Sequence, residues 1–151
     1  MNETVIATDH PLTAEQQRTL TAVLNTLLPP SEDGNMPGAG ELDFVGYLQA
    51  QAESFVPALK SVTDAFAADF VELPLAERVS VVQTFSDQQK ALFDGLLLQL
   101  YSFYYQQDRV LTGIGMGAGP PFPRGNTLEA GDLSLLDPVL AQPRSYRKPH
   151  N

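Results

Sequence analysis

The chain has 151 residues, 43% of them hydrophobic, which is enough for one domain with a real core. It has no cysteine and only two histidines, near its ends, which argues against disulfides, thiolate chemistry and histidine-based metal or acid–base sites. The net charge of −9 is uneven: residues 1–107 hold 14 acidic and 4 basic side chains, a net −10, and residues 108–151 hold a net +1. This argues against nucleic acid or an anionic membrane as a partner.

The sequence contains no run of about 18 apolar residues, so we expect no segment that inserts into a membrane. The first residues lack a basic start, a long apolar stretch and a twin-arginine pair. As the sequence stands, we expect a cytoplasmic chain. The alternative is a periplasmic one whose export signal was removed or is carried by a partner.

The predicted helices begin after a loose segment over residues 1–11. Thr13-Ala-Glu-Gln16 has the pattern of a capping box, and the apolar face that follows it ends at Pro29-Pro30. Residues 31–40 are rich in turn formers. Apolar periodicity then predicts helices over about 41–53, 56–71 and 74–85.

The longest predicted helix covers about residues 87–107 and opens at a second capping-box pattern, Ser86-Asp-Gln-Gln89. It is apolar on more than one face, so it should lie centrally or meet a partner. Four aromatic residues occupy its last turns, at 101, 103, 104 and 105. Consecutive helical positions diverge by about 100°, so at least one of these rings should face the tail or a partner.

The predicted fold class is all-α. A bundle of about five helices over residues 12–107 precedes a Gly/Pro loop and a long irregular tail over residues 108–151. The tail carries arginines and large apolar side chains, which interfaces favour, so we expect it to wrap a partner. The alternative is a tail folded back over its own acidic helices.

Three local patterns were weighed as sites of chemistry. Gly113-Ile-Gly-Met-Gly-Ala118 fits G-x-G-x-x-A, but a dinucleotide site needs a strand before it and a helix after it. The acids of residues 32–43 lack the spacing of a calcium loop. No serine lies in G-x-S-x-G, and no interior histidine could serve as its base. We therefore expect no catalytic residue, cofactor or metal in this chain.

Several short motifs follow one another along the chain. They are Leu27-Leu-Pro-Pro30, Ser31–Ala39, Asp43–Leu48, Tyr104-Tyr105, Val110-Leu111, Gly119–Gly125, Leu136–Val139 and Arg144–Arg147. Their order resembles that of the gluconate 2-dehydrogenase subunit 3 family, and the resemblance covers roughly residues 12–148.

This resemblance implies a non-catalytic small subunit. Such a subunit binds and stabilises a large FAD-dependent dehydrogenase subunit of the glucose–methanol–choline type, and escorts it through the twin-arginine export route. The FAD would belong to the partner. The residues expected to contact the partner are Tyr104, Tyr105, Pro120, Pro121, Phe122, Arg124, Leu136, Tyr146 and Arg147.

Two alternatives stay open. The chain could be a free-standing helical enzyme or small-ligand binder, with a closed apolar pocket lined by Phe66, Phe70 and the Tyr101–Tyr105 cluster. It could also be a self-associating module whose tail docks on a second copy.

Overall fold

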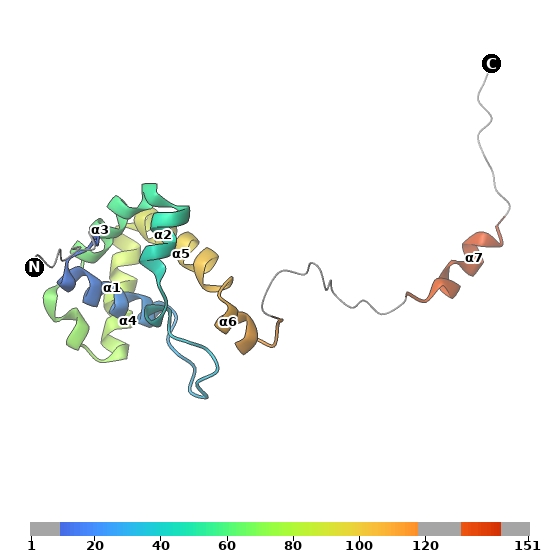
Figure 1. The fold of residues 1–151 in the computed structure, drawn as a ribbon, viewed down its shortest axis with the longest axis horizontal. Coiled ribbons are helices and arrows are strands. Elements are labelled where there is room, and N and C mark those ends of the chain that lie inside the picture. The colour runs from blue at the N-terminus through green and yellow to red at the C-terminus, as the bar shows by residue number, and fades with distance from the viewer. Residues whose placement is uncertain (1–9, 118–130, 143–151) are drawn as a thin grey trace, which may run out of the picture. The chain divides into compact units, whose positions relative to one another are not determined.

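A computed structural model describes residues 10–117 and 131–142. The chain divides after Gly119 into two compact units. Every regular element in the described residues is helical, which confirms the all-α class (Figure 1).

The first unit holds six α-helices and three short 3-10 turns within its described residues. In chain order they are α1 (Ala14–Leu27), η1 (Ala39–Glu41), α2 (Phe44–Gln51), η2 (Glu53–Phe55), α3 (Val56–Asp64), η3 (Ala68–Glu72), α4 (Leu75–Gln88), α5 (Lys90–Tyr104) and α6 (Asp108–Gly113). The described part of the second unit holds η4 (Leu133–Leu136) and α7 (Asp137–Leu140).

The start of α1 is the capping box that the sequence predicts. The Gln16 backbone N–H donates to Thr13 Oγ1 at 3.2 Å, and the Thr13 N–H donates to Gln16 Oε1 at 3.0 Å. Two donors that no helical carbonyl could satisfy are thereby paired within four residues.

The second predicted capping box does not form. Ser86 lies inside α4, and its hydroxyl donates to the Gln83 carbonyl at 2.7 Å, as helical serines often do. The helical conformation is interrupted three residues later, at Gln89, so α5 begins at Lys90 rather than at residue 87. The helix α4 extends past its predicted end at residue 85 because Phe85 is held in the core. The buried Phe85 ring packs against Phe66, with 5.1 Å between centroids.

Two further differences concern element boundaries. The helix predicted over residues 56–71 is divided into α3 and η3. The body also extends past residue 107, because α6 packs onto it and Val110 is fully buried.

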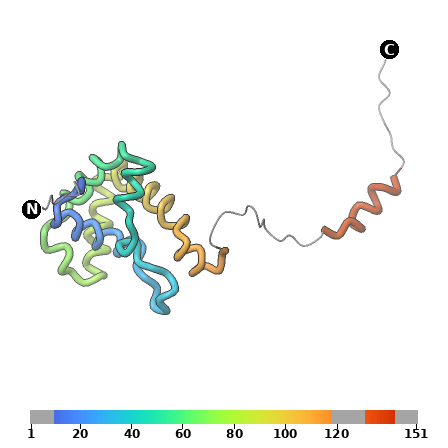
Figure 2. The backbone as a smooth tube through the Cα atoms, in the orientation of Figure 1, coloured from blue at the N-terminus to red at the C-terminus, as the bar shows by residue number. Residues whose placement is uncertain are grey.

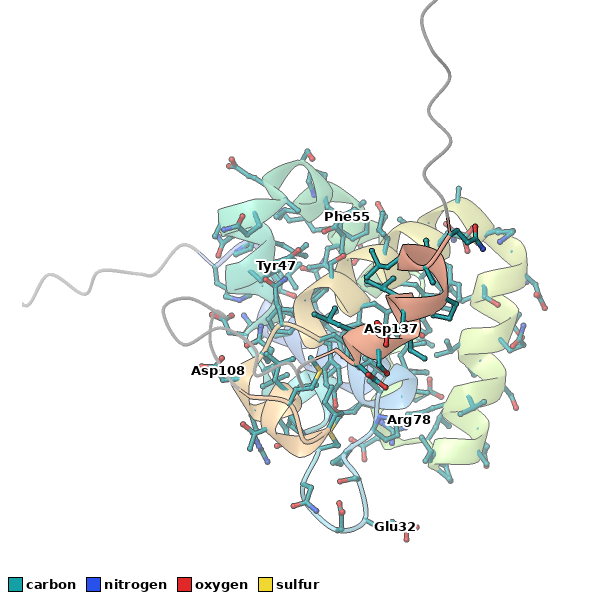
Figure 3. The ribbon with its side chains drawn as sticks, turned by 90° about the vertical axis from the view of Figure 1, so that its right-hand side faces the viewer. Glu32, Tyr47, Phe55, Arg78, Asp108 and Asp137 are labelled. Carbon is teal, nitrogen blue, oxygen red and sulfur yellow. The ribbon has the colours of Figure 1, made fainter. Side chains whose placement is uncertain are left out.

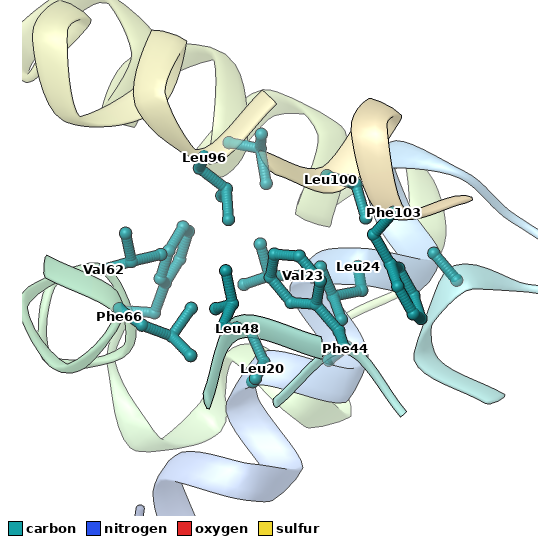
Figure 4. Close-up of a cluster of buried hydrophobic side chains, with 14 of the residues drawn as sticks. Leu20, Val23, Leu24, Phe44, Leu48, Val62, Phe66, Leu96, Leu100 and Phe103 are labelled. Atoms are coloured by element: carbon teal, nitrogen blue, oxygen red, sulfur yellow. The ribbon is translucent and has the colours of Figure 1, made fainter. Parts of the chain in front are cut away.

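The core lies between α1 and α5, with α2 and α3 closing its sides (Figure 4). Phe44 of α2 is 1% exposed, and its ring lies 5.4 Å from that of Phe103 on α5. The other side chains drawn around them come from four helices and the residues beside them: Leu20, Val23, Leu24, Leu48, Val62, Phe66, Leu96 and Leu100. Gly95 lets α5 approach Phe55 closely, because a Cβ on this residue would lie 3.1 Å from the Phe55 ring.

The loop of residues 28–38 leaves the body and returns beside α6 (Figure 2). Two glycines permit close approaches around it. A Cβ on Gly113 would lie 2.7 Å from the Asn35 carbonyl oxygen, and one on Gly40 would lie 2.6 Å from the Thr21 carbonyl oxygen of α1. The backbone of the loop therefore lies against α6, and the backbone of η1, which follows the loop, lies against α1.

Replacing Gly40 with alanine is expected to lower the free energy of unfolding by about 1–3 kcal/mol, because the added methyl group meets a helix backbone that cannot turn aside. Urea unfolding of the full chain measures this. Gly117→Ala is the matched control, since nothing lies within 4 Å of its Cβ position, and an equal loss in both variants would contradict the steric explanation.

No helix in the described ranges is both long and apolar enough to cross a bilayer.

Candidate functional site

One face of α5 exposes large apolar side chains. Leu98 is 66% exposed, Tyr101 45% and Tyr105 49%. Their spacing of three and four residues places them on one side of the helix, and we call these three residues the α5 stripe. Leu96, Leu100 and Phe103 point into the core instead. Two of the four aromatic rings, those of Tyr101 and Tyr105, are exposed, and the expectation that they face the tail or a partner stays a prediction.

Tyr104 occupies a different place from the one expected of a contact residue. It is 2% exposed, and its hydroxyl donates to the Pro37 carbonyl at 2.7 Å. The Tyr105 ring packs edge-on against it at 5.3 Å between centroids, and Tyr101 lies 6.2 Å from Tyr105. Tyr104 therefore anchors the C-terminal end of α5 to the loop of residues 28–38 and supports the stripe from beneath.

Tyr104→Phe is expected to lower the free energy of unfolding by about 1 kcal/mol at neutral pH, because the buried Pro37 carbonyl loses its donor. Burial raises the pKa of Tyr104 above its ordinary value of 10.0. The unfolded chain then gives up this proton first, so the wild-type advantage is present below pH 10.0 and shrinks as pH rises further. Urea unfolding of both proteins from neutral to alkaline pH tests this, and a gap that widened with pH would contradict it.

The described part of the tail is helical rather than irregular. Asp132 begins η4 by accepting from the Ser134 N–H at 3.0 Å and from the Ser134 hydroxyl at 2.6 Å. These hydrogen bonds hold the pKa of Asp132 below its ordinary value. Leu136, a predicted contact residue, is 50% exposed.

Large apolar side chains recur along η4 and α7 without a core of their own. Five are exposed, by 50–76%: Leu133, Leu135, Leu136, Val139 and Leu140. Leu133, Leu136 and Leu140 follow a spacing of three and four residues, which puts them on one side of a helix. Such a short segment cannot bury them within itself.

The remaining predicted contact residues lie outside the described residues. They are Pro120, Pro121, Phe122, Arg124, Tyr146 and Arg147.

The glycines after residue 112 serve the backbone. The helix α6 precedes them, where a dinucleotide site would need a strand. Gly115 has a φ of 78°, a left-handed conformation that glycine adopts without strain. This is the geometry of a turn.

The acids of residues 32–43 are mostly engaged in local structure. Asp33 accepts from the Ser31 hydroxyl and from Asn35, and these bonds lower its pKa. Glu41 accepts from the Gly38 N–H at 2.9 Å and pairs with Arg109 at 3.1 Å, whereas Glu32 projects from the tip of the loop (Figure 3). Among the residues that the structure describes, no three His, Asp or Glu side chains gather as metal ligands would.

The closed pocket required by the small-ligand alternative is not formed by the expected residues. Phe66 and Phe70 are core residues whose rings lie 4.7 Å apart. Tyr101 and Tyr105 lie exposed on α5. These two groups therefore do not line one enclosed cavity.

Leu98 is the surface residue that the predicted contact set missed. The signal was present in the sequence, because Leu98, Tyr101 and Tyr105 share one helical face. The sequence did not show which face of this apolar helix the core would cover.

Comparisons with protein-family models, with curated proteins and with solved structures find no match for this chain. The family resemblance taken from the order of the motifs stays a prediction.

Proposed function

We propose that this chain is a non-catalytic small subunit that binds and stabilises a large FAD-dependent dehydrogenase subunit of the glucose–methanol–choline type. The observation that carries the proposal is the exposed α5 stripe on a packed helical body. The class of the partner is taken from the motif order alone.

The chemistry of the α5 stripe supports a protein partner. Tyrosine is enriched at the centres of interfaces, where its large ring buries much area with little loss of side-chain freedom. Tyr101 packs against Tyr105, and Tyr105 packs against the buried Tyr104, so their positions are set before a partner arrives. A preorganised contact loses less conformational entropy on binding.

The tail segment offers a second kind of contact. Leu133, Leu136 and Leu140 give it one apolar side, and apolar residues at such spacing suit a short helix bound in a hydrophobic groove. Asp132 already caps the segment, which favours its helical form. On this proposal the groove belongs to the large subunit.

Co-expression tests the proposal. The tagged chain is produced together with a large FAD-dependent dehydrogenase of the glucose–methanol–choline type from the same organism, and it is purified by its tag. Size-exclusion chromatography then follows protein and flavin absorbance together. We expect flavin to elute with both polypeptides in one peak and the large subunit to aggregate when produced alone.

Two results would contradict this proposal. A flavoprotein that is equally stable and never co-elutes with the chain would remove the binding function. A stable dimer of the chain that persists in the presence of the flavoprotein would favour the self-associating module, and multi-angle light scattering distinguishes the two.

A further inference from the structure

A groove of about 730 Å³ lies on a part of the first unit distant in sequence from the α5 stripe. Its lining comes from α1, η3 and α4, and we call it the α1–α4 groove. The residues that line it are Ala14, Gln17, Arg18, Thr21, Ala22, Asn25, Val71 and Arg78. The apolar part consists of short side chains, and two arginines are its only charged members.

Arg78 has a buried donor that is unused. Its Nε is inaccessible to water and has no hydrogen-bond partner in the described structure. Arg78 lies on α4, which packs against α1, and Figure 3 places its side chain on the side of α4 nearest α1. Buried polar groups are nearly always paired, and a charged one left unpaired is costly. Because this Nε is inaccessible, an acceptor in the groove can reach only the terminal N–H groups of Arg78.

The neutral polar side chains of the groove already have partners within the chain. The Gln17 amide donates to the Leu12 carbonyl at 3.0 Å, and the Thr21 hydroxyl donates to the Gln17 carbonyl at 3.0 Å. Asn25 Oδ1 accepts from the Gly40 N–H at 2.8 Å. Arg78 differs from them because no group in the described chain accepts a hydrogen bond from its Nε–H.

Positive charge in this groove is unusual for the protein. Arg18 and Arg78 form no ion pair within the described residues, whereas Lys90 pairs with Asp94 and Arg109 pairs with Glu41. Glu15 and Glu72 line a smaller hollow next to Arg18, but neither forms an ion pair with it. Two free guanidinium groups therefore face one groove on an otherwise acidic body.

We propose that the α1–α4 groove binds an organic acid, whose carboxylate is held by Arg78 and Arg18 and whose uncharged body lies along α1. A guanidinium presents parallel N–H donors that match the two oxygens of a carboxylate. The two terminal N–H groups of Arg78 form such a pair, since its Nε is buried. Arg18, at the rim, adds a second charge.

The groove favours a carboxylate over a phosphate for two reasons. A phosphate dianion brings more negative charge to an acidic body, with only two cations to balance it. The rest of the lining, Ala14, Ala22 and Val71, offers apolar contact to a carbon chain rather than donors to further oxygens. Each buried CH₂ group of such a chain contributes about 0.8 kcal/mol, or roughly four-fold in affinity.

Hexanoate, acetate and inorganic phosphate serve as probes of the full-length, ¹⁵N-labelled chain by NMR titration. The Arg78 Nε–H signal is assigned by its loss in Arg78→Lys. We expect hexanoate to shift this signal saturably and to bind at least about ten-fold more tightly than acetate. We expect phosphate to produce no saturable shift over the same concentrations.

Matched variants separate the fork of Arg78 from charge alone. Backbone signals of the groove report hexanoate binding in every variant. Arg78→Lys keeps the charge but lacks the paired donors, and it should bind hexanoate about ten-fold or more weakly. Lys60→Gln removes an exposed cation from α3, outside the groove, and should bind like wild type.

Three results would overturn the proposal. The Arg78 Nε–H signal could stay unmoved by hexanoate, Arg78→Lys could bind as tightly as wild type, or phosphate could bind more tightly than hexanoate. The wild-type titration decides even if Arg78→Lys fails to fold. The wild-type titration does not depend on a flavoprotein, because the groove shares no residue with the α5 stripe.

Discussion

Leu98→Asp is expected to weaken binding of the large subunit at least about 100-fold, which corresponds to about 2.8 kcal/mol. A leucine buried at an interface contributes about 1.5–3 kcal/mol, and the substitution also places an unpaired carboxylate in a desolvated contact. Because Leu98 is 66% exposed in this structure, the free energy of unfolding should change by no more than about 0.5 kcal/mol. Competition between differently tagged wild-type and variant chains for the co-expressed large subunit measures the first effect, and urea unfolding measures the second.

Val79→Asp is the matched control for this experiment. Val79 is 49% exposed on α4, a different helix from the one that carries the α5 stripe, and the change introduces the same charge. Its affinity for the large subunit should stay within about two-fold of wild type. If both variants bind equally well, the stripe is not the contact surface; if both lose binding equally, general charge repulsion is the better explanation.

Phe44→Ala is expected to lower the free energy of unfolding by about 3–5 kcal/mol, a large part of the stability of a domain this size. The Phe44 ring is 1% exposed and packs against Phe103, with Tyr47 stacked 6.4 Å away. Removing it leaves a cavity between α2 and α5 that these rings cannot collapse to fill. Urea denaturation monitored by circular dichroism measures the loss.

Tyr101→Ala is the comparison for that variant. Tyr101 lies 45% exposed, so the loss of its ring should cost the isolated chain less than about 1 kcal/mol while it weakens partner binding. The two variants together separate stability from binding. A Tyr101→Ala protein as unstable as Phe44→Ala would show that the stripe belongs to the chain's own core.

Local sequence patterns predicted most helices because their signals lie within a few residues. The Thr13–Gln16 capping box and the Pro29-Pro30 stop define α1 by hydrogen bonds and steric clashes that need no distant partner. Pro57 likewise lies in the first turn of α3. The all-α class follows from such patterns.

Where a local signal competed with packing, packing decided. Ser86-Asp-Gln-Gln89 has the pattern of a helix start, yet α4 runs through it because Phe85 packs against Phe66, nineteen residues away in the chain. The short helix α6 was missed for the same reason. Its six residues give little periodic signal, and burial of Val110 fixes its place.

In the candidate site, too, some features follow from the sequence alone and others only from tertiary packing. The sequence by itself determined that the last long helix of the body has more apolar surface than one core can cover, because adjacent helical positions point about 100° apart. Only the tertiary structure decided that Tyr104 faces inward, to donate to the Pro37 carbonyl sixty-seven residues away, while Leu98, Tyr101 and Tyr105 face out. It also decided that Arg18 and Arg78 share a groove, since α1 and α4 are brought together by packing and by no feature of either segment alone.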